Sequence, residues 1–392
     1  MSSLTSNDLK ASFNASLYAG RAAIQQRVLP AYRADFVESL AQSCTGGLGV
    51  FAGQPQVDET ILVTANLKNA QYTTGRNIHL GRVHSPYYLC WQIGLLAWLD
   101  NWQPDILVAE ANPRYLSTRR AVAWMHTRGR PVIGWGLGAP LVNQSQPGVL
   151  TSARTELRQR FYQMFDGMIA YSQKGAEEYQ VLGFPAEKVI IAPNAVIHRT
   201  LKDPTIRPGS FSSEPVILFV GRLQARKRID NLLRACTQLD PVIQPRLLIV
   251  GDGPARNELE QLAQSIYPQA EFTGALHGAA LEPCFNEADL FVLPGTGGLA
   301  VQQALGYGLP IIAAEGDGTL DDLVRPDNGW RVPANNIPVL KDTLQEALMD
   351  PERLRKMGRE SYRIGLEEVN IETMVSGFLD AFCTISYAGR FQ

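Results

Sequence analysis

Long apolar runs, paired cysteines and a secretory signal are all missing from this chain of 392 residues. No run of about 18 apolar residues occurs, so the sequence predicts no membrane-spanning helix. The five cysteines are odd in number and form no C-x-x-C pair, which indicates buried thiols in a cytosolic protein. The N-terminus lacks a basic stretch followed by an apolar one, so we expect no signal peptide.

Net charge is also small. The value of −2 gives no whole-chain signal for nucleic-acid binding. The charge is nevertheless uneven, because residues 1–205 carry 19 Lys+Arg against 14 Asp+Glu and residues 206–392 carry 17 against 24. A basic first half can attract phosphates or an anionic membrane surface, although an imbalance of this size also arises without a function.

Short apolar runs alternate with amphipathic segments along most of the chain. Residues 215–220, 246–250 and 290–293 are predicted strands in the second half, with predicted helices between them. Residues 105–110 and 131–136 show the same pattern in the first half. Repeated β-α units of this kind build a parallel sheet that helices cover on both faces.

The chain is therefore predicted to form two α/β domains. A stretch rich in Pro, Ser and Gly at residues 200–215 suits a hinge between them. We expect an N-terminal domain over residues 1–205, a C-terminal domain over 215–370, and a terminal helix over 371–392 that packs back on the first domain. Two hinged domains imply a cleft, and ligands of such sheets lie outside the carboxyl ends of the strands.

The loop "PGTGG" at residues 294–298 follows one predicted strand and precedes a predicted helix. A helix start presents unpaired backbone N–H groups and a partial positive charge, and glycines let an anion approach the backbone closely. The loop can thus bind a phosphate without any side chain. A tight turn with no ligand explains the glycines equally well.

A second loop, "VGRLQARKR" at residues 220–228, also follows a predicted strand. Its Arg222 and Lys227 could neutralise a diphosphate, since Arg grips two oxygens at once and Lys acts as a movable point charge. A solvated basic loop is the alternative, because Arg226 and Arg228 lie here too. Two such loops in one domain support an anion-binding function more strongly than either loop does alone.

These loops and their neighbours carry a family resemblance. The segments "ILFVGRL", "LLIVGDGP", "FTGAL", "ADLFVLP" and "NGW" follow one another as in retaining nucleotide-sugar glycosyltransferases. Over roughly residues 165–335 the chain resembles glycosyltransferase family 4 (glycosyl transferases group 1). The resemblance implies the GT-B fold, in which two Rossmann-like doubly wound α/β domains face a cleft. It also implies a hexosyltransferase that moves a sugar from a UDP- or GDP-linked donor to a glycan, lipid-linked or other hydroxyl acceptor.

The resemblance further implies roles for individual residues. Arg222 and Lys227 match the pair that binds the donor diphosphate, and two family glutamates eight positions apart fall on Gly295 and Gln303. Gln303 keeps hydrogen bonds to ribose hydroxyls, but Gly295 cannot hold a donor sugar, which leaves the donor open. The implied donor-binding residues are Gly221, Arg222, Lys227, Gly251, Ala275, Leu276, Thr296, Gly297, Gly298, Leu299 and Gln303.

Catalysis is expected to depend on orientation and charge rather than on a protein nucleophile. In such retaining enzymes the acceptor hydroxyl attacks the face that the nucleotide leaves, so we expect Arg222, Lys227 and Glu110 to act in catalysis. Glu110 as the cap of the following helix is the alternative. No D-x-D motif is present, so neither an essential metal nor a cofactor is expected besides the nucleotide-sugar co-substrate.

The first domain is expected to bind the acceptor through Tyr32, Arg33 and Asn112. A solvated Arg33 at the start of a helix is the alternative. The aromatic residues of segment 87–102 recur at helical spacing. That segment is expected to be buried, or else to make a peripheral contact at the inner membrane face.

Three other functions fit parts of the sequence. "GTGGLA" satisfies G-x-G-x-x-A, with Glu315 twenty residues after Gly295, which is the pattern of an NAD(P)-dependent oxidoreductase. The missing glutamates suit a noncatalytic nucleotide-sugar-binding partner subunit. A nucleotide-sugar epimerase of the same fold would need catalytic acids that the sequence does not reveal.

Overall fold

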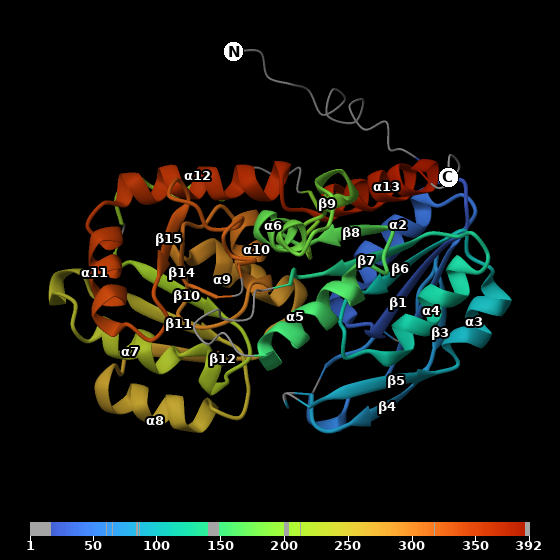
Figure 1. Cartoon of the computed structure of the whole chain (residues 1–392). Helices are drawn as coiled ribbons and strands as arrows, with labels where there is room; N and C mark the ends of the chain where they lie inside the picture. Colours follow the sequence, from blue (N-terminus) through green and yellow to red (C-terminus); the bar gives the residue numbers. More distant parts are fainter. Residues whose placement is uncertain are drawn as a thin grey trace, which may run out of the picture. The chain divides into compact units, whose positions relative to one another are not determined.

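The computed structural model describes residues 17–59, 61–64, 66–83, 85, 87–139, 149–199, 204–211, 213–316 and 318–388. The chain divides into two compact units, one formed by Met1–Asn194 with Ile371–Gln392 and the other by Ala195–Asn370. Each unit contains one parallel sheet and the helices that cover it (Figure 1). Two Rossmann-like sheets of this kind are the α/β architecture predicted from the sequence.

The first unit is built on a seven-stranded sheet in the order β3-β2-β1-β6-β7-β8-β9. All of its neighbouring strands are parallel. The central strands are buried along most of their length, because helices cover both faces, and they are mainly apolar apart from Gln25, Gln26 and Arg27 of β1. The strands are β1 (Ala22–Val28), β2 (Leu48–Gly53), β3 (Gln71–Thr74), β6 (Ile106–Glu110), β7 (Val132–Gly136), β8 (Gly167–Ala170) and β9 (Val189–Ile191).

A separate antiparallel hairpin belongs to the same unit and consists of β4 (Arg76–Leu80) and β5 (Leu89–Ile93). The last helix of the chain also packs here: Phe378 of α13 lies 4.8 Å from the Phe36 ring of α2 and 5.0 Å from Trp135. The helices of this unit are α2 (Ala34–Ser43), α3 (Leu95–Trp102), α4 (Leu116–His126), α5 (Val149–Tyr162), α6 (Gln173–Val181) and α13 (Ile371–Ala388), with short 3-10 turns η1 (Ala31–Arg33), η2 (Val57–Glu59) and η3 (Ala186–Lys188).

The second unit is a six-stranded parallel sheet in the order β12-β11-β10-β13-β14-β15. Its strands are β10 (Val216–Val220), β11 (Arg246–Val250), β12 (Ala270–Gly274), β13 (Leu290–Leu293), β14 (Ile311–Ala314) and β15 (Gly329–Val332). Its helices are α7 (Ile229–Cys236), α8 (Arg256–Ile266), α9 (Glu282–Glu287), α10 (Leu299–Gly306), α11 (Ile337–Leu348) and α12 (Pro351–Glu367), with turns η4 (Ala225–Lys227), η5 (Pro241–Ile243) and η6 (Gly278–Leu281).

The prediction of one continuous helix for segment 87–102 is wrong. Residues before Gly94 form β5, Gly94 adopts a left-handed φ of 91°, and α3 begins at Leu95. The backbone of Gly94 disfavours residues with a side chain, so it ends the strand and starts the helix. In the part of the chain that the structure describes, no helix is both long and apolar enough to cross a membrane.

The cysteines are unpaired, as the sequence indicates. Cys44, Cys90, Cys236 and Cys284 are buried, and Cys383 is half-buried. Burial raises the pKa of the Cys44 thiol to about 12. These thiols therefore pack as small apolar side chains rather than as reactive groups.

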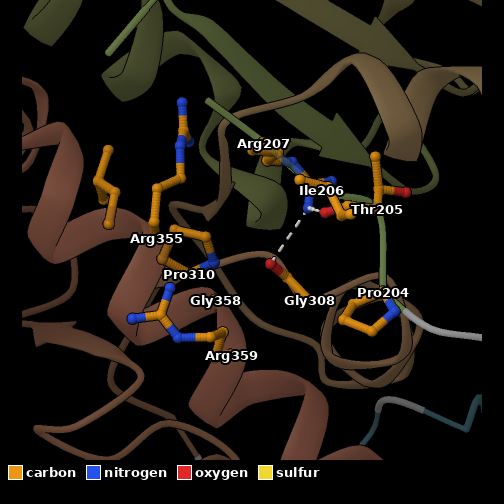
Figure 2. Close-up of a pocket in the computed structure, with 10 residues that line it drawn as sticks. Pro204, Thr205, Ile206, Arg207, Gly308, Pro310, Arg355, Gly358 and Arg359 are labelled. Atoms are coloured by element: carbon orange, nitrogen blue, oxygen red, sulfur yellow. Dashed lines mark hydrogen bonds between the residues drawn. The ribbon is translucent and has the colours of Figure 1, made fainter. Parts of the chain in front are cut away.

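The described part of the Pro- and Gly-rich segment 200–215 lies against the second unit. Arg207 donates to the carbonyl oxygens of Phe285 and Ala288, at 2.8 and 2.7 Å, and to those of Tyr307 and Gly308, at 3.0 and 3.3 Å. These carbonyls end α9 and α10, where the helix dipole is negative. Figure 2 shows the bond to Gly308 and the pocket that the segment forms with α12 near Arg359.

Replacing Arg207 by methionine should destabilise the second unit, because four helix-end carbonyls lose a charged donor. We expect the free energy of unfolding to fall by about 3 kcal/mol in a urea titration. Arg359→Met is the matched control, since Arg359 lines the same pocket but is exposed, and should change stability by less than about 0.5 kcal/mol. Equal urea midpoints for the two variants would contradict this role of Arg207.

Candidate active site

The chain reverses its direction of travel across the second sheet between β10 and β13. Strands β10, β11 and β12 follow one another toward one edge, whereas β13, β14 and β15 follow one another toward the other. Ligands of open α/β sheets bind outside the carboxyl ends of the strands at such a reversal. The loops that follow β10 and β13 are residues 221–228 and 294–298, which lie within the two loops singled out from the sequence.

The structure joins these two loops. The Lys227 ammonium donates to the Thr296 carbonyl oxygen at 2.6 Å, and the Arg226 guanidinium donates to the Thr296 hydroxyl at 3.1 Å. In return the Thr296 N–H donates to the Arg226 carbonyl oxygen at 3.2 Å. The residues after β10 and those after β13 therefore form one continuous surface at the reversal point.

Lys227 brings a positive charge to this surface, and its ammonium group is partly buried. Burial, together with the nearby charge of Arg226, lowers the pKa of the Lys227 ammonium to about 8. Within the described residues no carboxylate pairs with Lys227, and the acceptor it has is the neutral carbonyl of Thr296. A partly buried ammonium without a counter-ion is well suited to bind an anion.

Arg222 supplies a second cation on the same loop. It lies two residues after β10 and is exposed. Its side chain has no hydrogen-bond or ion-pair partner among the residues that the structure describes, so the guanidinium is available to a ligand. Arg222 and Lys227 thus occupy the loop at the reversal point, as the sequence analysis requires of a diphosphate-binding pair.

Gly295 allows the two loops to touch. A Cβ atom at this position would lie 2.3 Å from the Arg226 carbonyl oxygen and 2.6 Å from the Lys227 carbonyl carbon. These are backbone atoms, so they cannot move aside as a side chain can. The glycine at the position where the resemblance implies a glutamate is therefore a packing requirement of this chain, because no side chain fits there without separating the loops.

The start of α10 is open beside the lysine. Gly298 precedes the helix with no side-chain cap, and a Cβ atom there would meet only the Thr319 hydroxyl, at 3.8 Å, among the described residues. The N–H groups of a first helical turn have no acceptor within the helix. No described residue accepts a hydrogen bond from the N–H of Gly298 or Leu299, so both donors face a space that an anion can enter.

The other residues expected from the sequence to bind the donor lie on neighbouring loops or on α10. The Gly251 N–H donates to the Gly274 carbonyl oxygen at 2.8 Å, which ties the loop after β11 to the end of β12. Ala275 and Leu276 follow β12 directly, and Gln303 is half-buried on α10. Gly221 follows β10 directly. A Cβ atom on Gly251 would lie 1.9 Å from the Gly221 carbonyl oxygen. Gly297, with a φ of 144°, lies beside the Lys227 ammonium.

The first unit has its own reversal point, between β1 and β6. Glu110 ends β6, and its carboxylate accepts from the Arg27 N–H at 2.7 Å. Burial raises the pKa of Glu110, while the Arg27 N–H and the charges of Arg33 and Arg27 oppose that rise. Glu110 does not cap the following helix, because α4 begins at Leu116; Asn112 accepts from the Arg114 N–H at 3.1 Å and stabilises the turn between them.

Arg33 is buried, with 7% of its surface exposed, so the interpretation as a solvated arginine is wrong. Its guanidinium lies 4.2 Å from the centre of the Trp135 ring and donates to the Tyr171 hydroxyl at 2.9 Å. Nη1 is buried with no hydrogen-bond partner among the described residues. Tyr32 is partly exposed beside it. A buried donor of this kind points to an anionic or hydroxyl-bearing ligand.

Sequence reasoning missed an ion pair near Glu110. The Arg27 guanidinium contacts Glu59 with N–O distances of 2.6 and 2.8 Å, and both side chains are almost fully buried. Burial tends to raise the pKa of Glu59, but the hydrogen bonds from Arg27 lower it. No local pattern links two residues that lie so far apart in the sequence, so only the fold reveals the pair.

Two known protein families match large parts of this chain. The family described as "Glycosyl transferases group 1" matches residues 205–364, and the one described as "Glycosyltransferase Family 4" matches residues 53–199. The GDP-mannose-dependent alpha-mannosyltransferase of Mycolicibacterium smegmatis is 39% identical over 123 residues, which are 31% of this chain and 30% of that protein. The sulfoquinovosyl transferase SQD2 of Arabidopsis thaliana is 34% identical over 119 residues, 30% of this chain and 22% of that protein.

Solved structures match over nearly the whole chain at low identity. Anabaena Alr3699/HepE in complex with UDP gives a TM-score of 0.68 at 15% identity, covering 93% of this chain and 99% of that one. Sucrose-phosphate synthase from Thermosynechococcus elongatus gives 0.66 at 18% identity, covering 94% and 99%. With the two parallel sheets, these similarities show the GT-B fold.

The chain belongs to glycosyltransferase family 4, since the two family matches together span most of it. The alignments to the curated relatives above cover less than a third of each relative's length.

Proposed function

We propose that this protein is a retaining glycosyltransferase that moves a sugar from a UDP- or GDP-linked donor to a hydroxyl of a glycan or lipid-linked acceptor. The observation that carries the proposal is the Lys227 ammonium, held at the reversal point by the Thr296 carbonyl without a carboxylate partner. Beside it, the open start of α10 offers N–H donors. An ammonium and a bare helix start together bind a diphosphate, which is the leaving group of such a donor.

The donor half of the reaction needs few side chains. Lys227 and Arg222 neutralise the charge that grows on the diphosphate as the sugar leaves, and the N–H groups of Gly298 and Leu299 bind its oxygens. Gln303 hydrogen-bonds the ribose hydroxyls. Ala275 and Leu276, in the loop after β12, contact the base. Gly295 offers no carboxylate to the sugar, so sugar selectivity depends on other contacts.

The acceptor half is assigned to the first unit. Tyr32, Arg33 and Asn112 bind the acceptor, and Glu110 orients its hydroxyl. The bond from the sugar carbon to the leaving phosphate oxygen breaks as the acceptor oxygen bonds to that carbon on the same face, and the hydroxyl proton passes to a phosphate oxygen. Orientation and charge then supply the catalysis, with neither a protein nucleophile nor a metal ion assigned a step.

The proposal includes both nucleotide bases, the uracil of UDP and the guanine of GDP. The name of one relative specifies GDP-mannose, and one similar structure is a complex with UDP.

Nucleotide release from a panel of UDP- and GDP-sugars, with lipid and glycan extracts as acceptors, tests the proposed activity. We expect turnover with at least one donor. Saturable UDP or GDP binding without turnover would favour the noncatalytic partner subunit that the missing glutamate suits, and binding of NADH alone would favour an oxidoreductase.

The pH dependence of nucleotide binding should report the charge of Lys227. In the free protein this ammonium loses its proton as the pH rises through about 8, and a bound diphosphate raises the pKa again. Binding of UDP or GDP at about pH 8.5 should therefore take up a large fraction of one proton, whereas binding at about pH 6.5 should take up little. Calorimetry in two buffers of different ionisation enthalpy measures the uptake.

Lys227→Arg is the control for this measurement, since a guanidinium stays charged throughout the range. Uptake should vanish in that variant while nucleotide still binds. The same uptake in both proteins, or none in the wild type, would contradict the assignment of Lys227 to the diphosphate.

The proposal places the enzyme in the cytoplasm, at the inner membrane face when its acceptor is lipid-linked. A peripheral membrane contact is the alternative to burial for the aromatic segment 87–102. Since that segment forms β5 and α3, it cannot make such a contact as one continuous helix.

A further inference from the structure

The hairpin formed by β4 and β5 exposes apolar side chains, whereas a surface sheet normally exposes polar ones. Residues paired across the hairpin point to the same face, and one face carries three pairs: Arg76 with Ile93, Ile78 with Trp91, and Leu80 with Leu89. We name this set of six residues the hairpin face. Of its four aliphatic members, Ile78, Leu80 and Ile93 are 41%, 55% and 45% exposed, and Leu89 is half-buried.

The opposite face of the hairpin holds polar side chains and is turned inward. Asn77 donates to the Arg27 carbonyl oxygen at 2.8 Å, and Gln92 donates to the Gln26 carbonyl oxygen at 2.9 Å. These bonds fasten the hairpin to the end of β1. An antiparallel sheet with one face in water normally does the reverse, with apolar side chains inside and polar ones outside. The inversion means that something other than water is expected on the hairpin face.

Arginines accompany the hairpin face without carboxylates beside them in the sequence. Residues 76–99 and 111–120, which include the hairpin and the start of α4, contain five Arg and no Asp or Glu. Arg82 and Arg114 are exposed, and the Arg120 guanidinium lies 5.6 Å from the centre of the Trp91 ring. Tyr87, just before β5, is 84% exposed. Figure 1 shows the hairpin apart from the main sheet of its unit.

We propose that the hairpin face docks this protein on an anionic lipid surface. Apolar side chains flanked by arginines and aromatic rings match the interface of a bilayer, where the apolar groups enter the acyl boundary and the cations meet lipid phosphates. A lipid surface fits better than a protein partner because the charge around the face has a single sign over two chain segments. The docking does not depend on the donor site, so its test is separate from that of the glycosyltransferase proposal.

Sedimentation with lipid vesicles tests the docking without donor or acceptor. The intact protein should bind vesicles of phosphatidylcholine with 30% phosphatidylglycerol (about 0.3 mole fraction) and bind phosphatidylcholine alone far more weakly. Binding should fall as salt rises, because the arginine contribution is screened. The triple variant Ile78→Ser, Leu80→Ser, Ile93→Ser should lose on the order of tenfold or more in partition to the anionic vesicles.

Matched controls separate the hairpin face from general surface hydrophobicity. The triple variant Val181→Ser, Ile206→Ser, Val242→Ser removes exposed aliphatic side chains elsewhere and should bind vesicles as the wild type does. Arg76→Glu with Arg82→Glu should weaken binding by about fivefold per arginine. Thermal unfolding checks that each variant folds, and Lys227→Ala should leave vesicle binding unchanged.

Two results would overturn the proposal. One is equal vesicle binding by the wild type and the Ile78, Leu80, Ile93 variant. The other is a wild type that binds neither vesicle but self-associates in a way that this variant abolishes, which would make the hairpin face a protein interface.

Discussion

Lys227→Ala should lower kcat/KM for sugar transfer by about 10²–10³-fold or more while the protein stays folded. The ammonium bridges the loops after β10 and β13, and in the proposed reaction it neutralises the leaving diphosphate. Removing it leaves growing negative charge opposed only by Arg222 and the start of α10. Steady-state kinetics with whichever donor turns over, together with circular dichroism, measures both parts of the expectation.

Lys356→Ala is the matched control for that variant. Lys356 is an exposed lysine on α12 of the same unit, so its loss changes net charge equally without touching the proposed site. Transfer by this control should match the wild type. Unchanged transfer by Lys227→Ala would contradict the assignment of this residue to the diphosphate.

Gly295→Ala should be far more damaging than Gly298→Ala, although the two glycines are three residues apart. A Cβ atom at Gly295 meets backbone atoms of Arg226 and Lys227 at 2.3–2.7 Å, whereas one at Gly298 finds nothing closer than 3.8 Å among the described residues. We expect Gly295→Ala to lower the free energy of unfolding by about 1–3 kcal/mol and to weaken nucleotide binding as the Lys227 loop shifts. Gly298→Ala should change stability by less than about 0.5 kcal/mol.

Urea unfolding and calorimetric titration with UDP and GDP measure the two effects of Gly295→Ala. Gly295 is also the position at which the resemblance implies a glutamate. Should Gly295→Ala or Gly295→Glu unfold at the wild-type urea concentration, the loops would not be packed through this glycine.

The position of the two loops at the reversal point could be predicted because their signals are local in sequence. Residues 220–228 and 294–298 each follow an apolar strand directly, and the alternation of strands and helices fixes which sheet edge they share. The contact between Lys227 and Thr296 was not predictable in detail, because it depends on how closely two backbones approach. Gly295 shows the same limit: the sequence marks a lost carboxylate, and the structure adds the reason that no side chain fits.

The first unit was less predictable because its interactions are long-range. Arg27 with Glu59 and Arg33 with Tyr171 join residues that no periodicity connects. Segment 87–102 was misassigned because outward residues of β5 and apolar residues of α3 together imitate a helical repeat. Gly94 between them was the available signal, since an isolated glycine in a helical pattern lowers confidence in the helix. The inverted hairpin face follows from that strand and could not be inferred without it.

A crystal structure with UDP and then GDP is the most direct test of the account, which depends on diphosphate binding at the reversal point of the second sheet. We expect diphosphate oxygens within hydrogen-bonding distance of the Gly298 and Leu299 N–H groups and of the Lys227 ammonium, with Arg222 reaching the same group. A nucleotide whose phosphates lie away from residues 221–227 and 295–299, or a site that neither nucleotide enters, would contradict it.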